Sequence, residues 1–167
     1  MTRVIAVTHL PFAGFFFAAA TARAVLLSIL PLKALSLLGS AQHVSVLFFV
    51  VSVCGIGASL GIYSILRHIS LRTGFLISSL VLVLSIALLW TQDLWTFSLG
   101  MMLHVFGITS MEVILSLYVM QKIPRSQLSE FEPLRMVSTV MALSIGPWLG
   151  VYLQSRYADW LPFVVAA

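Results

Sequence analysis

A twenty-residue apolar segment, residues 134–153, most strongly constrains what this chain can fold into. At about 1.5 Å per residue, a helix of this length crosses a hydrocarbon core of roughly 30 Å. Its Pro147 cannot donate a backbone hydrogen bond to the carbonyl of Leu143, so the helix should loosen there. Gly146 and Gly150 share one helix face, where the missing side chains allow another helix to approach closely. Because a membrane helix keeps such a defect only among neighbouring helices, the segment predicts a bundle.

The composition indicates an integral membrane protein. Hydrophobic residues make up 60% of the chain and charged residues 8%, and the mean hydropathy is +1.10, far from the usual balance of a soluble globular protein. The net charge of +4 comes from basic residues spread between the apolar runs, so no patch for nucleic acid is expected. The single cysteine, Cys54, excludes an internal disulfide, and its apolar surroundings predict a small buried residue without a role.

We expect an all-α polytopic membrane protein with five complete transmembrane helices and a truncated sixth. The sixth apolar run has eight residues, or about 12 Å of helix, which is too short to span a bilayer. We therefore interpret residues 1–167 as one transmembrane unit and as a fragment of a longer chain. Two connections are short, whereas residues 121–133 are polar and read as a longer loop. The predicted spans are residues 11–35, 44–66, 73–90, 95–120, 134–153 and, incomplete, 160–167.

The basic residues and the boundary aromatics predict the orientation. A cytoplasmic N-terminus satisfies the preference of Lys and Arg for the cytoplasmic side, with six such residues inside and two outside. The same orientation places four amphipathic aromatics at the outer boundary, where they prefer to lie. The inner residues are Arg3, Arg67, Arg72, Lys122, Arg125 and Arg135, the outer ones are Lys33 and Arg156, and the aromatics are Trp90, Trp95, Tyr157 and Trp160.

Two charges fall inside predicted spans. Arg23 lies about 18 Å from the cytoplasmic end of the first span and Glu112 about 15 Å from that of the fourth, at 1.5 Å per residue. An unpaired charge at this depth costs at least about 2.5 to 3.5 kcal/mol. We therefore expect the two side chains to face a cavity, paired directly or through water or substrate, and to take part in substrate binding or proton coupling. The alternatives are a purely structural ion pair, or Arg23 extending alone to the interface.

Catalytic chemistry is not indicated. A membrane protease or metalloenzyme would need paired aspartates, a Ser/His pair or a motif such as HExxH, and the sequence has none of these at a usable spacing. His104, in the fourth span, is a further substrate or coupling candidate, although a hydrogen-bonded packing residue is the more ordinary interpretation. We expect no enzyme, no cofactor, no metal and no nucleic-acid partner.

The arrangement of spans and the GPxxG sequence resemble the N-terminal half of a major facilitator superfamily transporter. The matching residues of the fifth-span motif are Gly146, Pro147 and Gly150, with Val151 in place of a second glycine. The family's loop between spans two and three is matched by Gly61, Arg67 and Arg72, without the aspartate that would precede Arg67. Its fourth-span pattern is matched by Leu99 and Gly107, with Leu103 at the position of an arginine.

The resemblance implies secondary transport of a small solute by alternating access, with the fifth-span motif favouring efflux or antiport. It also implies two six-span halves with the substrate site near the bilayer midplane. The expected partners are the lipid bilayer, a small-molecule substrate, a proton and a missing C-terminal transmembrane half. The expected location is a bacterial-type inner (plasma) membrane. The alternative is a non-transporting integral membrane subunit that acts through helix packing and has no water-accessible buried charges.

Overall fold

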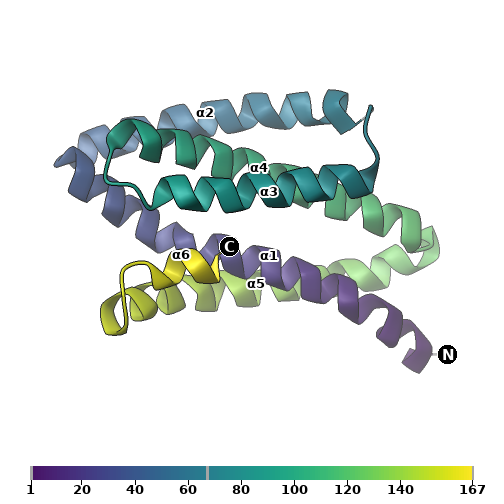
Figure 1. The fold of residues 1–167 in the computed structure, drawn as a ribbon. Helices are drawn as coiled ribbons and strands as arrows, with labels where there is room; N and C mark the ends of the chain where they lie inside the picture. The colour runs from purple at the N-terminus through teal and green to yellow at the C-terminus, as the bar shows by residue number, and fades with distance from the viewer. Residues whose placement is uncertain (1, 67, 167) are drawn as a thin grey trace.

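The computed structural model describes residues 2–66 and 68–166, and this part of the chain is all-α (Figure 1). By length and composition, five of its helices can cross a membrane, which confirms the predicted fold class of a polytopic membrane protein with a short sixth helix. The helices are α1 (Thr2–Leu38), α2 (Ala41–Leu66), α3 (Leu71–Leu89), α4 (Leu94–Lys122), α5 (Arg125–Arg156) and α6 (Leu161–Val165).

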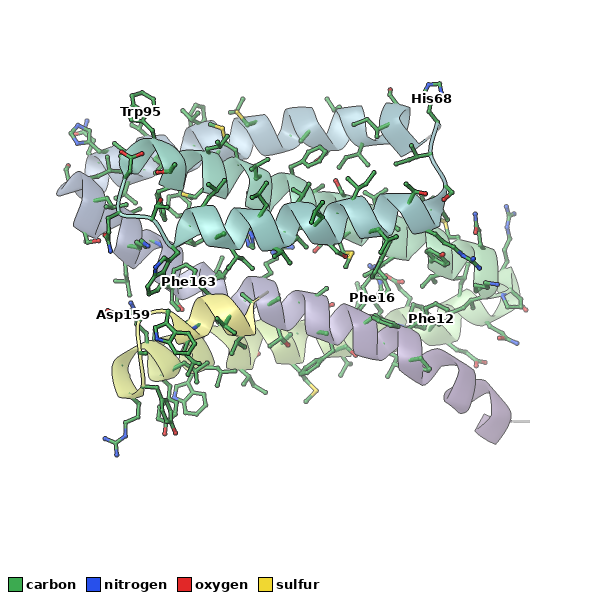
Figure 2. All side chains as sticks on the ribbon, viewed as in Figure 1. Phe12, Phe16, His68, Trp95, Asp159 and Phe163 are labelled. Atoms are coloured by element: carbon green, nitrogen blue, oxygen red, sulfur yellow. The ribbon has the colours of Figure 1, made fainter. Side chains whose placement is uncertain are left out.

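Successive long helices run in opposite directions, so the connections alternate between the two ends of the bundle (Figure 1). The α2–α3 and α4–α5 connections lie at the end near the N-terminus, and the other three lie at the opposite end. Figure 2 shows His68 at the first end and Trp95 and Asp159 at the second. The four boundary aromatics belong to helix ends and connections on this second side and are all exposed there. The four aromatics therefore share one end of the bundle, as predicted, whereas their place at the outer membrane boundary stays a prediction.

The predicted long polar loop at residues 121–133 is wrong. Helix α4 continues to Lys122 and α5 begins at Arg125, so only two residues connect them. The first turns of α5 are helical because they have an apolar face: Phe131 is fully buried and Leu128 packs against the same cluster, which also contains Phe16 of α1. This tertiary packing outweighs the loop-like composition of the segment. Helix α1 likewise continues past Pro31 and ends at Leu38, three residues beyond the predicted span.

The helices form two groups, α2 with α3 and α4, and α1 with α5 and α6 (Figure 1). The larger core cluster joins them where α1 approaches the other group, with Leu26 and Ile29 of α1 against Leu89 of α3 and Phe97 of α4. Lys33 of α1 adds polar contacts at the same end, because its Nζ donates to the carbonyl of Leu89 at 2.7 Å and to that of Trp90 at 2.8 Å. A cation suits these carbonyls, which form the negative end of the α3 dipole.

The glycines of α5 make the predicted close contact, and the partner is α1. A Cβ built on Gly146 would collide with Cβ of Ala24, and one built on Gly150 would collide with the backbone carbonyl oxygen of Val25. Ser28 of α1 donates its hydroxyl to the carbonyl of Pro147 at 3.1 Å, which adds a polar contact beside the two glycines. The helix continues through Pro147, and the missing side chains let the two helices approach to backbone contact.

The α3–α4 turn is fixed by a helix cap at Asp93. Its carboxylate accepts hydrogen bonds from the backbone N–H of Thr96 at 2.9 Å and from the Thr96 hydroxyl at 2.7 Å. These bonds favour the charged form, so they lower the pKa of the Asp93 carboxyl below its usual value, the backbone bond contributing most. The cap explains why the turn needs only a few residues.

Gly146→Ala should destabilise the protein, because the added methyl group meets the backbone and Cβ of Ala24, which no side-chain rotation can move away. Overpacking of this kind costs about 1 to 3 kcal/mol, more than the helix propensity gained from alanine. Thermal unfolding in detergent measures the effect. Gly57→Ala is the matched control, because Gly57 of α2 has nothing within 4 Å and should tolerate alanine. Equal unfolding temperatures for the two variants would contradict the contact.

The orientation predicted from the basic residues can be tested at the two connections that Ser70 and Gln92 mark. Cys54 is exposed rather than buried as expected, so it must first be replaced, as Cys54→Ala. In that background, an impermeant maleimide added to intact cells should label Gln92→Cys and leave Ser70→Cys unlabelled. The reverse pattern would mean that the N-terminus lies outside.

Candidate functional site

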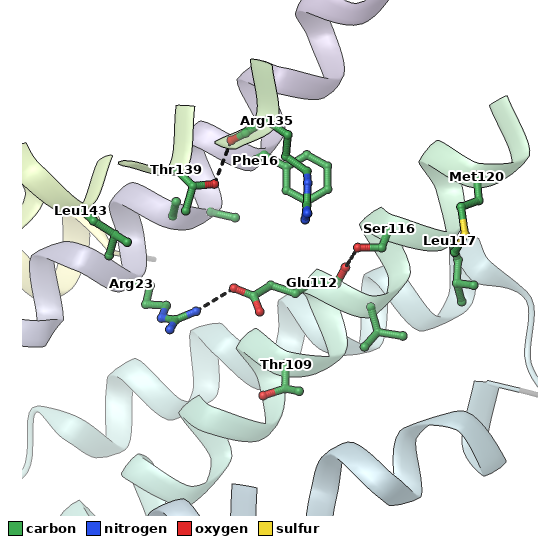
Figure 3. A pocket seen from close by; sticks show the side chains of 13 residues that line it. Phe16, Arg23, Thr109, Glu112, Ser116, Leu117, Met120, Arg135, Thr139 and Leu143 are labelled. Atoms are coloured by element: carbon green, nitrogen blue, oxygen red, sulfur yellow. Dashed lines mark hydrogen bonds and ion pairs between the residues drawn. The ribbon is translucent and has the colours of Figure 1, made fainter. Parts of the chain in front are cut away.

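The two charges predicted to meet inside the membrane form a direct ion pair (Figure 3). Nη1 of Arg23 in α1 donates to Oε1 of Glu112 in α4 at 2.8 Å. The residues are 89 positions apart in the chain, so the pair links the two helix groups. Each side chain is 49% exposed in the isolated chain. The direct pairing is thus confirmed, whereas a role in coupling stays a prediction.

The pair borders a cavity of about 410 Å³ between α1, α4 and α5 (Figure 3). This volume lies within the usual range of small-molecule sites, roughly 300 to 1,000 Å³. Its walls are largely apolar, with polar and charged groups from all three helices. The lining residues are Phe16, Ala19, Ala20, Arg23, Thr109, Glu112, Val113, Ser116, Leu117, Met120, Arg135, Thr139 and Leu143.

Arg135 is the functional candidate that the sequence did not reveal. It was counted among the cytoplasmic basic residues, yet it lies more than two turns inside α5 and lines the cavity. Its Nε donates to Glu132 at 3.1 Å, and its guanidinium carbon lies 5.3 Å from the ring centroid of Phe16. The available signal was the i, i+3 spacing of Glu132 and Arg135, which is typical of a charge pair on a helix rather than of a loop. Without Arg135, the basic residues at that end still outnumber those at the other.

The hydroxyl groups in the cavity are turned back onto their own helices. Thr109 donates to the carbonyl of Val105 at 2.7 Å, Ser116 to that of Glu112 at 2.8 Å, and Thr139 to that of Arg135 at 3.0 Å. A hydroxyl has a single proton, so each of these oxygens is left as an acceptor toward the cavity.

His104 is buried and hydrogen-bonded, as the packing interpretation expects. Its Nδ1 lies 3.2 Å from Oγ of Ser85, and the Ser85 hydroxyl donates to the carbonyl of Leu82 at 2.7 Å. Because the only serine proton is used there, Nδ1 carries the hydrogen of this contact and donates it. His104 and Glu112 also line two further cavities of about 340 and 350 Å³, so the histidine borders the same polar region as the pair.

The remaining motif residues have other surroundings. Gly61 lies in the last turns of α2 and Arg72 in the first turn of α3, so both belong to helices rather than to the connection; both are exposed. Arg67 lies outside the described residues. Gly107 packs α4 against Leu82 of α3, since a Cβ there would come within 2.9 Å of the leucine side chain. The structure does not bring Gly61, Arg72 or Gly107 into contact with the Arg23–Glu112 pair.

Comparison with known proteins yields no relative: no family model, no curated protein and no solved structure matches the chain. The fold and the site therefore define only the class of protein: a polytopic membrane protein with five candidate spans that contacts lipid and holds an ion pair beside a cavity. No family is assigned on these findings.

Charge reversal tests the pair. Arg23→Glu and Glu112→Arg should each lower the unfolding temperature in detergent, because each places two like charges together, and the double swap should recover part of the loss. The coupling energy should be at most about 1 kcal/mol, because both groups are half-exposed. Arg156→Glu, at the exposed end of α5, is a control expected to change little. Strictly additive reversals would show that the two residues do not interact.

Proposed function

We propose that this chain is a transport unit of the major facilitator type, in which a small solute crosses the membrane by alternating access. The unit corresponds to the N-terminal half of such a transporter, energised by a solute or proton gradient, and the GPxxG segment in α5 favours efflux or antiport. The cavity between α1, α4 and α5 is the proposed solute site.

One observation carries the proposal: a half-exposed ion pair, Arg23 with Glu112, borders a cavity in the central part of two membrane-spanning helices. Hydrocarbon would penalise charges so exposed by several kcal/mol each, and such groups face water-filled cavities or one another in membrane proteins. A polar path beside these charges is what a solute needs near the bilayer midplane.

The alternative is a non-transporting membrane subunit that acts through helix packing. It would cover the charged face with another protein and would keep water out of the cavity. The two functions therefore differ in whether the cavity residues react with aqueous reagents, and from which side of the membrane.

Cysteine accessibility distinguishes them. In a Cys54→Ala background, Ser116→Cys and Thr139→Cys should react with a charged methanethiosulfonate added to sealed membrane vesicles, because both residues line the cavity. Transport by alternating access further expects that reagent trapped inside the vesicles also reacts. The matched control is Val140→Cys, one residue along α5 from Thr139, exposed on the surface and outside the cavity lining. Labelling from neither side would reject the transport proposal.

A further inference from the structure

Arginine supplies the strong hydrogen-bond donors in the main cavity. Arg23 uses one nitrogen, Nη1, for Glu112, and its other guanidinium nitrogens make no hydrogen bond to any of the described residues. Arg135 of α5 enters the same cavity opposite α4, with its guanidinium directed inward in Figure 3. The three hydroxyls, as described above, face the cavity as acceptors. Two arginines and one carboxylate therefore line this space, and Arg135 is also paired with Glu132 of its own helix.

The chain itself shows which anion fits the Arg23 guanidinium. Glu112 places a carboxylate there at 2.8 Å, the distance of a charge-assisted hydrogen bond. The pair is half-exposed, so the attraction is screened and its net energy is small. A second carboxylate entering the cavity can therefore compete with Glu112 for the same donors at little cost.

We propose that the cavity binds a small organic carboxylate, with its head group on the Arg23 guanidinium, and that Glu112 occupies this position when the cavity is empty. This inference deepens the proposed function, because the carboxylate is the solute class to be moved. Arg135 adds a second guanidinium to the lining, but two of its nitrogens already donate to Glu132 of its own helix, so Arg23 is the main donor for the carboxylate. The apolar wall, formed by Val113, Leu117 and Leu143, suits a hydrocarbon or aromatic body.

Benzoate is a suitable probe, with benzamide as its neutral isostere and benzylammonium as its cationic one. Binding to the purified chain is measured by calorimetry and thermal shift in a neutral detergent without added lipid, so that no lipid anion competes. Benzoate should bind and the two isosteres should not. Glu112→Gln should tighten benzoate binding by about two- to five-fold, the amount that loss of a screened competing ion pair releases. Arg23→Gln should abolish benzoate binding.

Matched variants separate this competition from a general charge effect. Glu130→Gln removes an exposed carboxylate of α5 outside the cavity lining, and Arg156→Gln removes an exposed arginine; both should leave benzoate binding unchanged. If Glu112→Gln does not fold, Glu112→Asp keeps the charge but shortens the reach, and should also tighten binding. Equal binding of benzamide, or unchanged or weaker benzoate binding in the Glu112 variants, would overturn the inference.

The carboxylate site and the transport role can be rejected independently of each other. Benzoate binding in detergent together with labelling from neither membrane side would keep the carboxylate site and reject the transport role. Labelling from both sides without benzoate binding would keep the transport proposal and reject the carboxylate as its solute.

Discussion

The backbone contact between α1 and α5 determines where the polar groups of this bundle lie. Ala24 meets Gly146 and the carbonyl of Val25 meets Gly150, so the rotation of α1 about its axis is fixed at this point. Arg23 directly precedes Ala24 and therefore lies about 100° around the helix from the α5 contact. That rotation carries its side chain toward α4, where Glu112 receives it. Gly146 and Gly150 of α5 thus determine the direction in which Arg23 of α1 points.

The depth of the pair limits what can surround it. The free-energy cost of placing either charge against hydrocarbon is larger than the stabilisation that a screened ion pair provides. The exposed halves of Arg23 and Glu112 should consequently border water or polar protein groups, although the large apolar side chains Leu27 and Met120 are exposed on the same two helices. A face that mixes two charges with such side chains suits a cavity better than a lipid boundary, which would be uniformly apolar.

The sequence predicts those features that depend on residues close together in the chain, and misses those that depend on tertiary packing. Span positions follow from runs of about twenty apolar residues, the α5 contact from missing side chains at Gly146 and Gly150, and the ion pair from counting depth along two helices. The helical start of α5 could not be predicted, because the burial of Phe131 is tertiary and polar residues surround it. Nor could the direction of Cys54, since α2 is apolar on all sides and gives no periodicity from which to read the inward face. Arg135 was missed for a different reason: the polar segment just before it was interpreted as a loop, which hid its place inside a helix.

The hydroxyl groups of the cavity act as hydrogen-bond acceptors and not as donors, and the apolar surroundings of a membrane helix explain why. A serine or threonine in an apolar helix readily donates its hydroxyl proton to the backbone carbonyl one turn earlier, as Thr109, Ser116 and Thr139 do. This removes them as donors, so among the described lining residues the side-chain donors for a ligand's acceptor group are the two guanidinium groups, whereas a ligand's own donors could meet Glu112 or a hydroxyl oxygen. Under the proposed function, charge would therefore discriminate between ligands more than neutral hydrogen bonding does, through side chains that come from three different helices.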